Sequence, residues 1–236
     1  MNIIYAVITG SHAYGTATET SDLDIRGVFL PTERQLLGFE PVQAVSRTEP
    51  HDVTYYPLRQ FAEMALSANP NILELLFVER EHILRMDPLG EELRKAREAF
   101  LSRRIYRSYR GFAHTVRKRL GGKKPPSAPR NSLIETHGYD TKEAAHLIRV
   151  LRTGLEAVKT GHFRTFRPEE ERDELLAIRA EKVPLEKVLL LADALEKELD
   201  EALSRSPLPE EPDAERVENL IIRLHRRAVF PGAATA

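Results

Sequence analysis

The chain has 236 residues, of which 42% are hydrophobic and 30% charged, with a formal net charge of −1 and no cysteine. This composition excludes a disordered chain, and it excludes a membrane-spanning one because no apolar run approaches the roughly 20 residues that a bilayer requires. The absence of cysteine excludes disulfides, thiolate zinc sites and cysteine nucleophiles, and it favours the reducing cytoplasm.

Short strand patterns dominate the first 90 residues. They cover residues 3–9, residues 22–30 and the stretch VTYYPL that begins at Val53. Residues 58–68 have a helical pattern, which Asn69-Pro70-Asn71 ends before a second apolar stretch. The mixture predicts an α/β domain with a small mixed sheet over residues 1–90.

Beyond Asp87 the strand patterns nearly vanish and helical periodicity takes over. Helical patterns cover roughly residues 89–120, 140–160, 169–180, 184–204 and 213–228. The sequence therefore predicts an all-helical second domain over residues 91–236.

Two aspartates stand one residue apart in the second strand pattern. The period of two places Asp22, Asp24 and Arg26 on one face. Paired carboxylates of this kind suit hard divalent cations. An isolated pair of aspartates, however, more often caps a turn or faces solvent. Asp52 begins the third strand and would add a carboxylate from a neighbouring strand, with Glu49 as its alternative.

A glycine and a serine directly follow the first strand. Gly10 and Ser11 begin a turn of small residues. Such a turn lets backbone N–H groups and a hydroxyl approach phosphate oxygens closely. Together with the aspartates, it predicts a site for a metal-bound phosphate.

The middle of the chain is strongly basic. Between Leu101 and Ile134 there are ten Lys or Arg and no Asp or Glu. A helical projection gathers basic side chains opposite an apolar face, and further lysines extend the stripe: Arg103, Arg107, Arg110, His114, Arg117, Lys118, Lys123 and Lys124. This basic stripe predicts a nucleic-acid or triphosphate surface. The main alternative is docking against the acidic carboxy-terminal helices.

The helical pattern 140–160 repeats this design. Asp140 stands at the position of a helix cap, and an apolar stripe runs along one side. Lys142, His146 and Arg149 line up on the opposite side at helical spacing. We expect Lys142 and Arg149, and also His146, to contact the phosphates of a nucleotide.

These motifs resemble a known family. The stretches GSHAYG and SDLDIRGVFL match the nucleotidyltransferase signature of the DNA polymerase β superfamily. They are most similar to predicted nucleotidyltransferases found beside RNA ligases in bacteria and phages. NPNILELLF (69–77) and GYDTKEAAHLIR (138–149) resemble further segments of that group.

The resemblance implies a chemistry and assigns residues to it. The superfamily binds a nucleoside triphosphate with two Mg²⁺ or Mn²⁺ held by three carboxylates, and transfers a nucleotidyl group with loss of pyrophosphate. Asp22 and Asp24 match the metal-binding pair, Asp52 the third carboxylate, and Gly10 with Ser11 the phosphate-contacting turn. The expected function is transfer to an acceptor hydroxyl, with RNA, as in RNA end repair, the favoured acceptor. The alternatives are an antitoxin-like enzyme that transfers AMP to a protein, and a non-catalytic nucleotide- or RNA-binding module.

Overall fold

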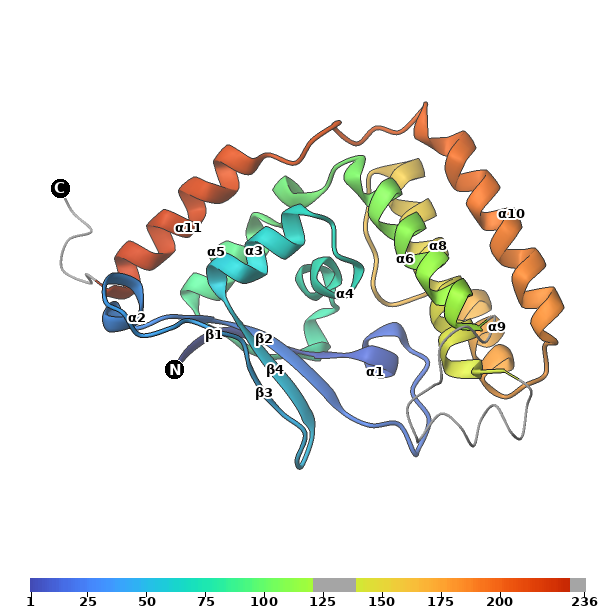
Figure 1. Ribbon diagram of the computed structural model, residues 1–236, viewed down its shortest axis with the longest axis horizontal. Helices are drawn as coiled ribbons and strands as arrows, with labels where there is room; N and C mark the ends of the chain where they lie inside the picture. Colours follow the sequence, from blue (N-terminus) through green and yellow to red (C-terminus); the bar gives the residue numbers. More distant parts are fainter. Residues whose placement is uncertain (121–138, 230–236) are drawn as a thin grey trace. The chain divides into compact units, whose positions relative to one another are not determined.

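The protein divides into two compact units, seen in a computed structural model that describes residues 1–120 and 139–229 (Figure 1). The first unit comprises Met1–Ser102 and the segment that begins at Glu211, and the second is Arg103–Glu210. The sequence instead predicts a division after residue 90 and a helical domain that continues to the end of the chain. The functional roles assigned to the two parts stay predictions.

The first unit is built on a mixed sheet. In the described residues its strand order is β3-β4-β2-β1-β5. The strands are β1 (Asn2–Thr9), β2 (Asp24–Leu30), β3 (Val45–Arg47), β4 (Asp52–Pro57) and β5 (Ile83–Met86). β2 and β4 run parallel, and the other neighbouring pairs run antiparallel. The sequence predicts β1, β2 and β4, but it does not predict the edge strands β3 and β5, which are too short for their alternation to be visible.

Helices pack on this sheet and extend the unit. They are α1 (Gly10–Tyr14), α2 (Glu33–Leu37), α3 (Leu58–Leu66), α4 (Pro70–Leu73), α5 (Pro88–Lys95) and α11 (Ala214–Val229), with 3₁₀ turns η1 (Glu74–Phe77), η2 (Arg80–His82) and η3 (Arg97–Phe100). α3 contacts β2 and β4, whereas α5 contacts β1 and β5. At Gly90 a Cβ would lie 2.1 Å from the carbonyl oxygen of Ile4, so only glycine allows α5 to approach β1 this closely.

The second unit is helical throughout its described part. It contains α6 (Arg104–Leu120), α8 (Thr141–Thr160), α9 (Glu169–Arg179) and α10 (Leu185–Leu203). α8 is the central helix and contacts the other three. The side chain of Asp140 caps it by accepting a hydrogen bond from the backbone N–H of Glu143 at 2.9 Å, as predicted.

The fold class predicted from the sequence is confirmed, because a mixed sheet in the first part is followed by a mostly helical part. The helical pattern at 89–120 is interrupted, since α5, η3 and α6 divide it. The other helical patterns match α8 to α11 within three residues at either end. None of the helices in the described ranges is long and apolar enough to cross a bilayer.

Candidate active site

The parallel strands β2 and β4 bring two aspartates side by side. Asp24 and Asp52 are the first residues of their strands and are partners in the strand register. Partners on adjacent strands point to the same face of the sheet. Asp22 precedes β2 and is exposed, and Glu49 lies exposed in the loop before β4. Strand register therefore favours Asp52 over Glu49 as the third carboxylate.

The carboxylate of Asp24 packs directly against the glycine turn. Thr9, the last residue of β1, is the register partner of Asp24, and Gly10 follows it with φ +66°. A Cβ on Gly10 would lie 2.5 Å from Oδ2 of Asp24, well inside contact distance. Glycine is thus required both by the backbone conformation and by the carboxylate. Ser11 is the next residue, in the first turn of α1.

The charge of Asp24 depends on its neighbours. Burial raises the pKa of Asp24 above its usual value. The charge of Arg26 opposes this rise, whereas the charges of Asp52 and Asp22 add to it. All three aspartates therefore lie close enough for their charges to interact, which is the arrangement that a bound cation would stabilise.

Arg26 is a site residue whose role the sequence does not reveal. It lies two residues after Asp24 and forms an ion pair with Asp52, at 2.9 Å between Nη2 and Oδ2. Its Nη1 also donates to Oδ1 of Asp52 at 3.2 Å. The period of two already places Arg26 on the face of Asp24, but only the register with β4 brings it to Asp52.

The three aspartates offer the hard oxygen ligands that Mg²⁺ or Mn²⁺ requires. Residues 1–120 and 139–229 nonetheless contain no group of three acidic or histidine side chains already arranged around a cation position. Both carboxylate oxygens of Asp52 are engaged by Arg26 instead. The donor set fits a divalent cation at Asp22 and Asp24, and for Asp52 such a cation would compete with Arg26, although each Asp52 oxygen keeps a second lone pair.

A partly buried hydrogen bond connects α1 to the segment NPNILELLF. The hydroxyl of Tyr14 donates to Oε1 of Glu74 at 2.6 Å, and Glu74 is only 4% exposed. Tyr14 lies four residues after Gly10, in the same short helix. The contact anchors the far end of the glycine turn, and it explains why a carboxylate stands within an apolar segment.

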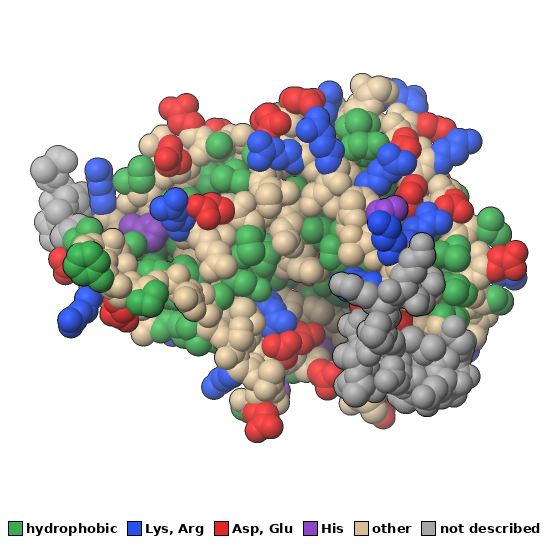
Figure 2. Space-filling model, in the orientation of Figure 1, with side chains coloured by type: hydrophobic (Ala, Val, Ile, Leu, Met, Phe, Trp, Pro, Cys, Tyr) green, Lys and Arg blue, Asp and Glu red, His purple; other side chains and the backbone are tan. Residues whose placement is uncertain are grey.

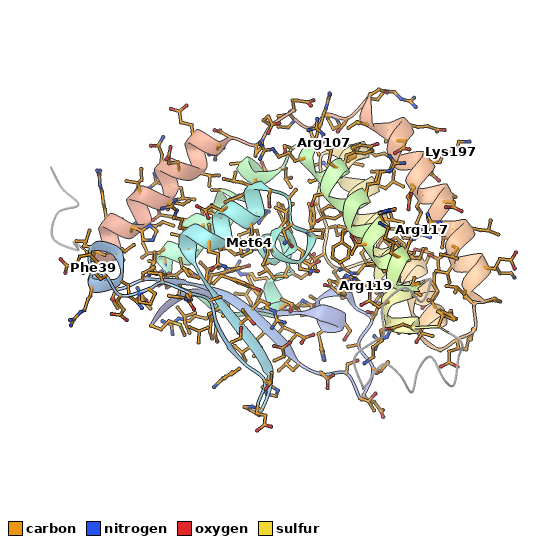
Figure 3. All side chains as sticks on the ribbon, viewed as in Figure 1. Phe39, Met64, Arg107, Arg117, Arg119 and Lys197 are labelled. Carbon is orange, nitrogen blue, oxygen red and sulfur yellow. The ribbon has the colours of Figure 1, made fainter. Side chains whose placement is uncertain are left out.

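The basic stripe of α6 is largely paired with acidic side chains of its own unit. Arg117 donates to Asp193 at 2.6 Å and to Glu196 at 3.0 Å, both on α10. Arg110 pairs with Asp200 of the same helix at 3.1 Å. Figure 2 shows basic and acidic side chains interspersed over this part of the surface, and Figure 3 shows Arg117 on the side of α6 that faces α10. These contacts favour docking, the main alternative to a nucleic-acid surface.

The remaining members of the stripe differ in their surroundings. Arg103 donates to the carbonyl oxygens of Ser206 and Leu208, and it approaches Glu210 at 3.4 Å. The side chain of Arg107 is 74% exposed and lies 3.7 Å from Glu210. His114 and Lys118 are exposed, whereas Lys123 and Lys124 lie outside the described residues. A role of these residues in binding nucleic acid stays a prediction.

The sequence predicts that Arg149 lies on a polar face of α8, and this prediction is wrong. Arg149 is 4% exposed, and its Nη2 lies 3.2 Å from Nδ1 of His146. The ring of His146 packs edge-on against Phe112, with 5.1 Å between the ring centres. Lys142 is exposed, as expected. The physical reason is that α8 is surrounded by α6, α9 and α10, so that little of its circumference resembles a simple solvent face.

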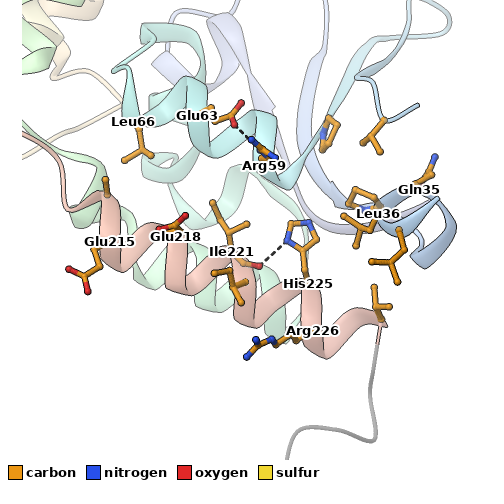
Figure 4. Close-up of a pocket in the computed structure, with 17 residues that line it drawn as sticks. Gln35, Leu36, Arg59, Glu63, Leu66, Glu215, Glu218, Ile221, His225 and Arg226 are labelled. Atoms are coloured by element: carbon orange, nitrogen blue, oxygen red, sulfur yellow. Dashed lines mark hydrogen bonds and ion pairs between the residues drawn. The ribbon is translucent and has the colours of Figure 1, made fainter. Parts of the chain in front are cut away.

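A large groove in the first unit is distinct from the aspartates. It has a volume of about 1010 Å³ and is lined by residues of α2, α3 and α11 (Figure 4). Pro31, which follows β2, and Pro57, which ends β4, both line it, so it lies at the opposite ends of these strands from Asp24 and Asp52. His225 donates from Nδ1 to the carbonyl oxygen of Ile221 at 2.9 Å within this groove. Burial lowers the pKa of His225.

Comparisons with known proteins identify the family of the chain. The model of the RNA repair pathway DNA polymerase beta family, RlaP, matches residues 1–223. The chain is 31% identical over 104 residues to the uncharacterized protein YcgL of Bacillus subtilis, a match that covers 42% of this chain and 40% of that protein. It is 25% identical over 126 residues to an uncharacterized 38.9 kDa protein of Enterobacteria phage T4, covering 48% of this chain and 37% of that protein. The chain thus spans about two fifths of each relative, and it belongs to the RNA repair pathway DNA polymerase beta family.

Proposed function

We propose that the protein is a metal-dependent nucleotidyltransferase, which moves a nucleotidyl group from a nucleoside triphosphate to an acceptor hydroxyl on RNA. The observation that carries the proposal is the position of Asp24, which is the register partner of Asp52 and lies against Gly10. Carboxylates can hold the metal ions that assist phosphoryl transfer, and a glycine lets backbone N–H groups approach phosphate oxygens closely. RNA as the acceptor is supported by the family description and not by the basic stripe, whose arginines are largely paired.

Each residue of the site has a proposed role in the reaction. Asp22 and Asp24 would hold two Mg²⁺ or Mn²⁺ ions together with Asp52, while Gly10 and Ser11 contact the phosphates. The ions, when bound, supply charge neutralisation of the triphosphate and lower the pKa of the acceptor hydroxyl. The oxygen of the acceptor hydroxyl bonds to the α-phosphorus, and Asp52 takes the proton that this hydroxyl loses. The bond between the α-phosphorus and the departing pyrophosphate breaks. Most of the rate enhancement would come from positioning and electrostatics.

Labelling with substrates of each class tests the proposal. The protein is incubated with each of the four nucleoside triphosphates labelled at the α-phosphate, with Mg²⁺ or Mn²⁺, and with a panel of RNA and protein acceptors. Label on RNA supports the proposal. Label on protein alone identifies the AMP-transferring alternative, and saturable nucleotide binding without any transfer identifies a non-catalytic module.

A further inference from the structure

The guanidinium of Arg26 is fixed by four hydrogen bonds. Two go to the carboxylate of Asp52, from Nη2 to Oδ2 at 2.9 Å and from Nη1 to Oδ1 at 3.2 Å. Two go to backbone carbonyl oxygens, those of Asp52 at 3.1 Å and Ile25 at 3.0 Å. This fork binds a carboxylate through both oxygens at once. Each oxygen of Asp52 therefore accepts a hydrogen bond from a cation that belongs to the protein, and this cation would compete with a metal ion for the carboxylate.

The two partners of this pair are not equally free to move. The side chain of Arg26 is 23% exposed and that of Asp52 is 47% exposed. The backbone carbonyls would still hold the guanidinium after the carboxylate had left. Arg26 is thus a permanent positive charge with a replaceable partner.

The pair lies where the third carboxylate of the proposed site is needed. Asp24 and Asp52 are register partners, and Arg26 lies two positions further along β2 on the same face. Without a counter-charge, Asp52 would add a third negative charge beside Asp22 and Asp24. We propose that Arg26 is a positioning residue that holds Asp52 away from the metal site until a divalent cation draws the carboxylate across. This inference rests on the proposed function, since it concerns the same site.

The competition can be measured as Mn²⁺ affinity without any nucleotide or acceptor. Calorimetric titration of the full chain with Mn²⁺ compares wild type with Arg26→Gln, which frees Asp52. We expect the affinity to rise roughly threefold to tenfold, the range that a partly exposed charged pair supports. The same substitution in an Asp52→Asn background should give no rise, because the competing carboxylate is gone.

A matched control separates this effect from a general change in charge. Arg47 on β3 is exposed and is the register partner of Val53, so it lies on the opposite face from Asp52. Arg47→Gln removes the same charge from the neighbouring strand and should leave Mn²⁺ affinity within twofold. Arg26→Lys keeps the charge but loses the fork, and we expect its affinity to lie between wild type and Arg26→Gln. Circular dichroism establishes that each variant is folded.

Several outcomes would overturn the inference. Unchanged or weaker Mn²⁺ binding in Arg26→Gln would mean that Arg26 does not compete for Asp52. An equal rise with and without Asp52, or an equal rise in Arg47→Gln, would indicate general electrostatics. Absence of Mn²⁺ binding in every variant would also reject it, whereas binding that appears only in Arg26→Gln would support it. If the protein transfers no nucleotide, the proposed function fails, yet the Mn²⁺ titrations still decide the role of Arg26.

Discussion

Replacing Gly10 by alanine tests whether the glycine turn and Asp24 form one unit. The residue has φ +66°, and an L-residue in the left-handed region costs about 1–2 kcal/mol. The added Cβ would also lie 2.5 Å from Oδ2 of Asp24, so the carboxylate has to move. We expect a modest loss of stability and a much larger loss of function, because a shift of about 1 Å at a reacting centre can lower a rate about 100-fold.

Two measurements on Gly10→Ala separate these effects. Urea denaturation gives the free energy of unfolding, and initial rates of Mg²⁺-dependent nucleotidyl transfer give the functional loss. Gly111→Ala is the matched control, since a Cβ there would meet no atom within 4 Å. In the interior of α6 the control should gain up to about 1 kcal/mol and keep its rate. A Gly10→Ala variant that loses stability but transfers nucleotide at the wild-type rate would refute the coupling of turn and carboxylate.

The remaining predictions concern stability and charge. The side chain of Arg167 is 1% exposed and pairs with Glu156, so Arg167→Leu should lower the free energy of unfolding by about 3–5 kcal/mol. The side chain of Arg164 binds the same Glu156 but is 51% exposed, so Arg164→Leu should lower it by less than about 1 kcal/mol. Equal losses in urea denaturation would contradict this. Burial lowers the pKa of His225 in the folded protein, so as the pH falls the imidazole is protonated in the unfolded chain before it is protonated in the folded one. The free energy of unfolding should therefore fall as the pH drops below about 6.5, and it should fall less steeply in His225→Gln. Parallel stability curves between pH 7 and 5 would exclude that residue as the cause. Arg117→Gln should lower stability by about 1–2 kcal/mol and leave RNA affinity within twofold at low and high salt, in filter-binding assays; a large loss of affinity would restore the nucleic-acid role of the stripe.

The sequence predicts the parts of the site that depend on local pattern. The alternation in residues 22–30 is enough to place Asp24 and Arg26 on one face, and Asp52 is correctly placed at the start of a strand. The parallel register of β2 and β4 is a long-range property that no local pattern contains. For this reason the sequence predicts the carboxylates, but it does not predict that Arg26 contacts Asp52.

The helices show the same division between local and long-range information. Periodicity predicts α8 and α10 well, because each has a clear apolar side, whereas α6 is only the last part of the pattern predicted at 89–120. It does not predict that Arg117 lies beside Asp193, 76 residues further along the chain. A central helix also violates the assumption of one buried face, which explains why Arg149 is buried when the pattern predicts exposure. Charge segregation along the chain was the only signal of the pairing, and it fits a nucleic-acid surface equally well.

The most direct test of the proposed site is the release of pyrophosphate. The wild-type protein, with Mg²⁺, a nucleoside triphosphate and an RNA acceptor, should release one pyrophosphate for each nucleotide transferred. The double variant Asp22→Asn with Asp24→Asn should lower the rates of pyrophosphate release and of nucleotide transfer by at least about 100-fold. Asp173 is an exposed aspartate on α9, and Asp173→Asn should leave both rates unchanged. Transfer at the wild-type rate in the double variant would contradict the assignment of the aspartates as the metal-binding centre.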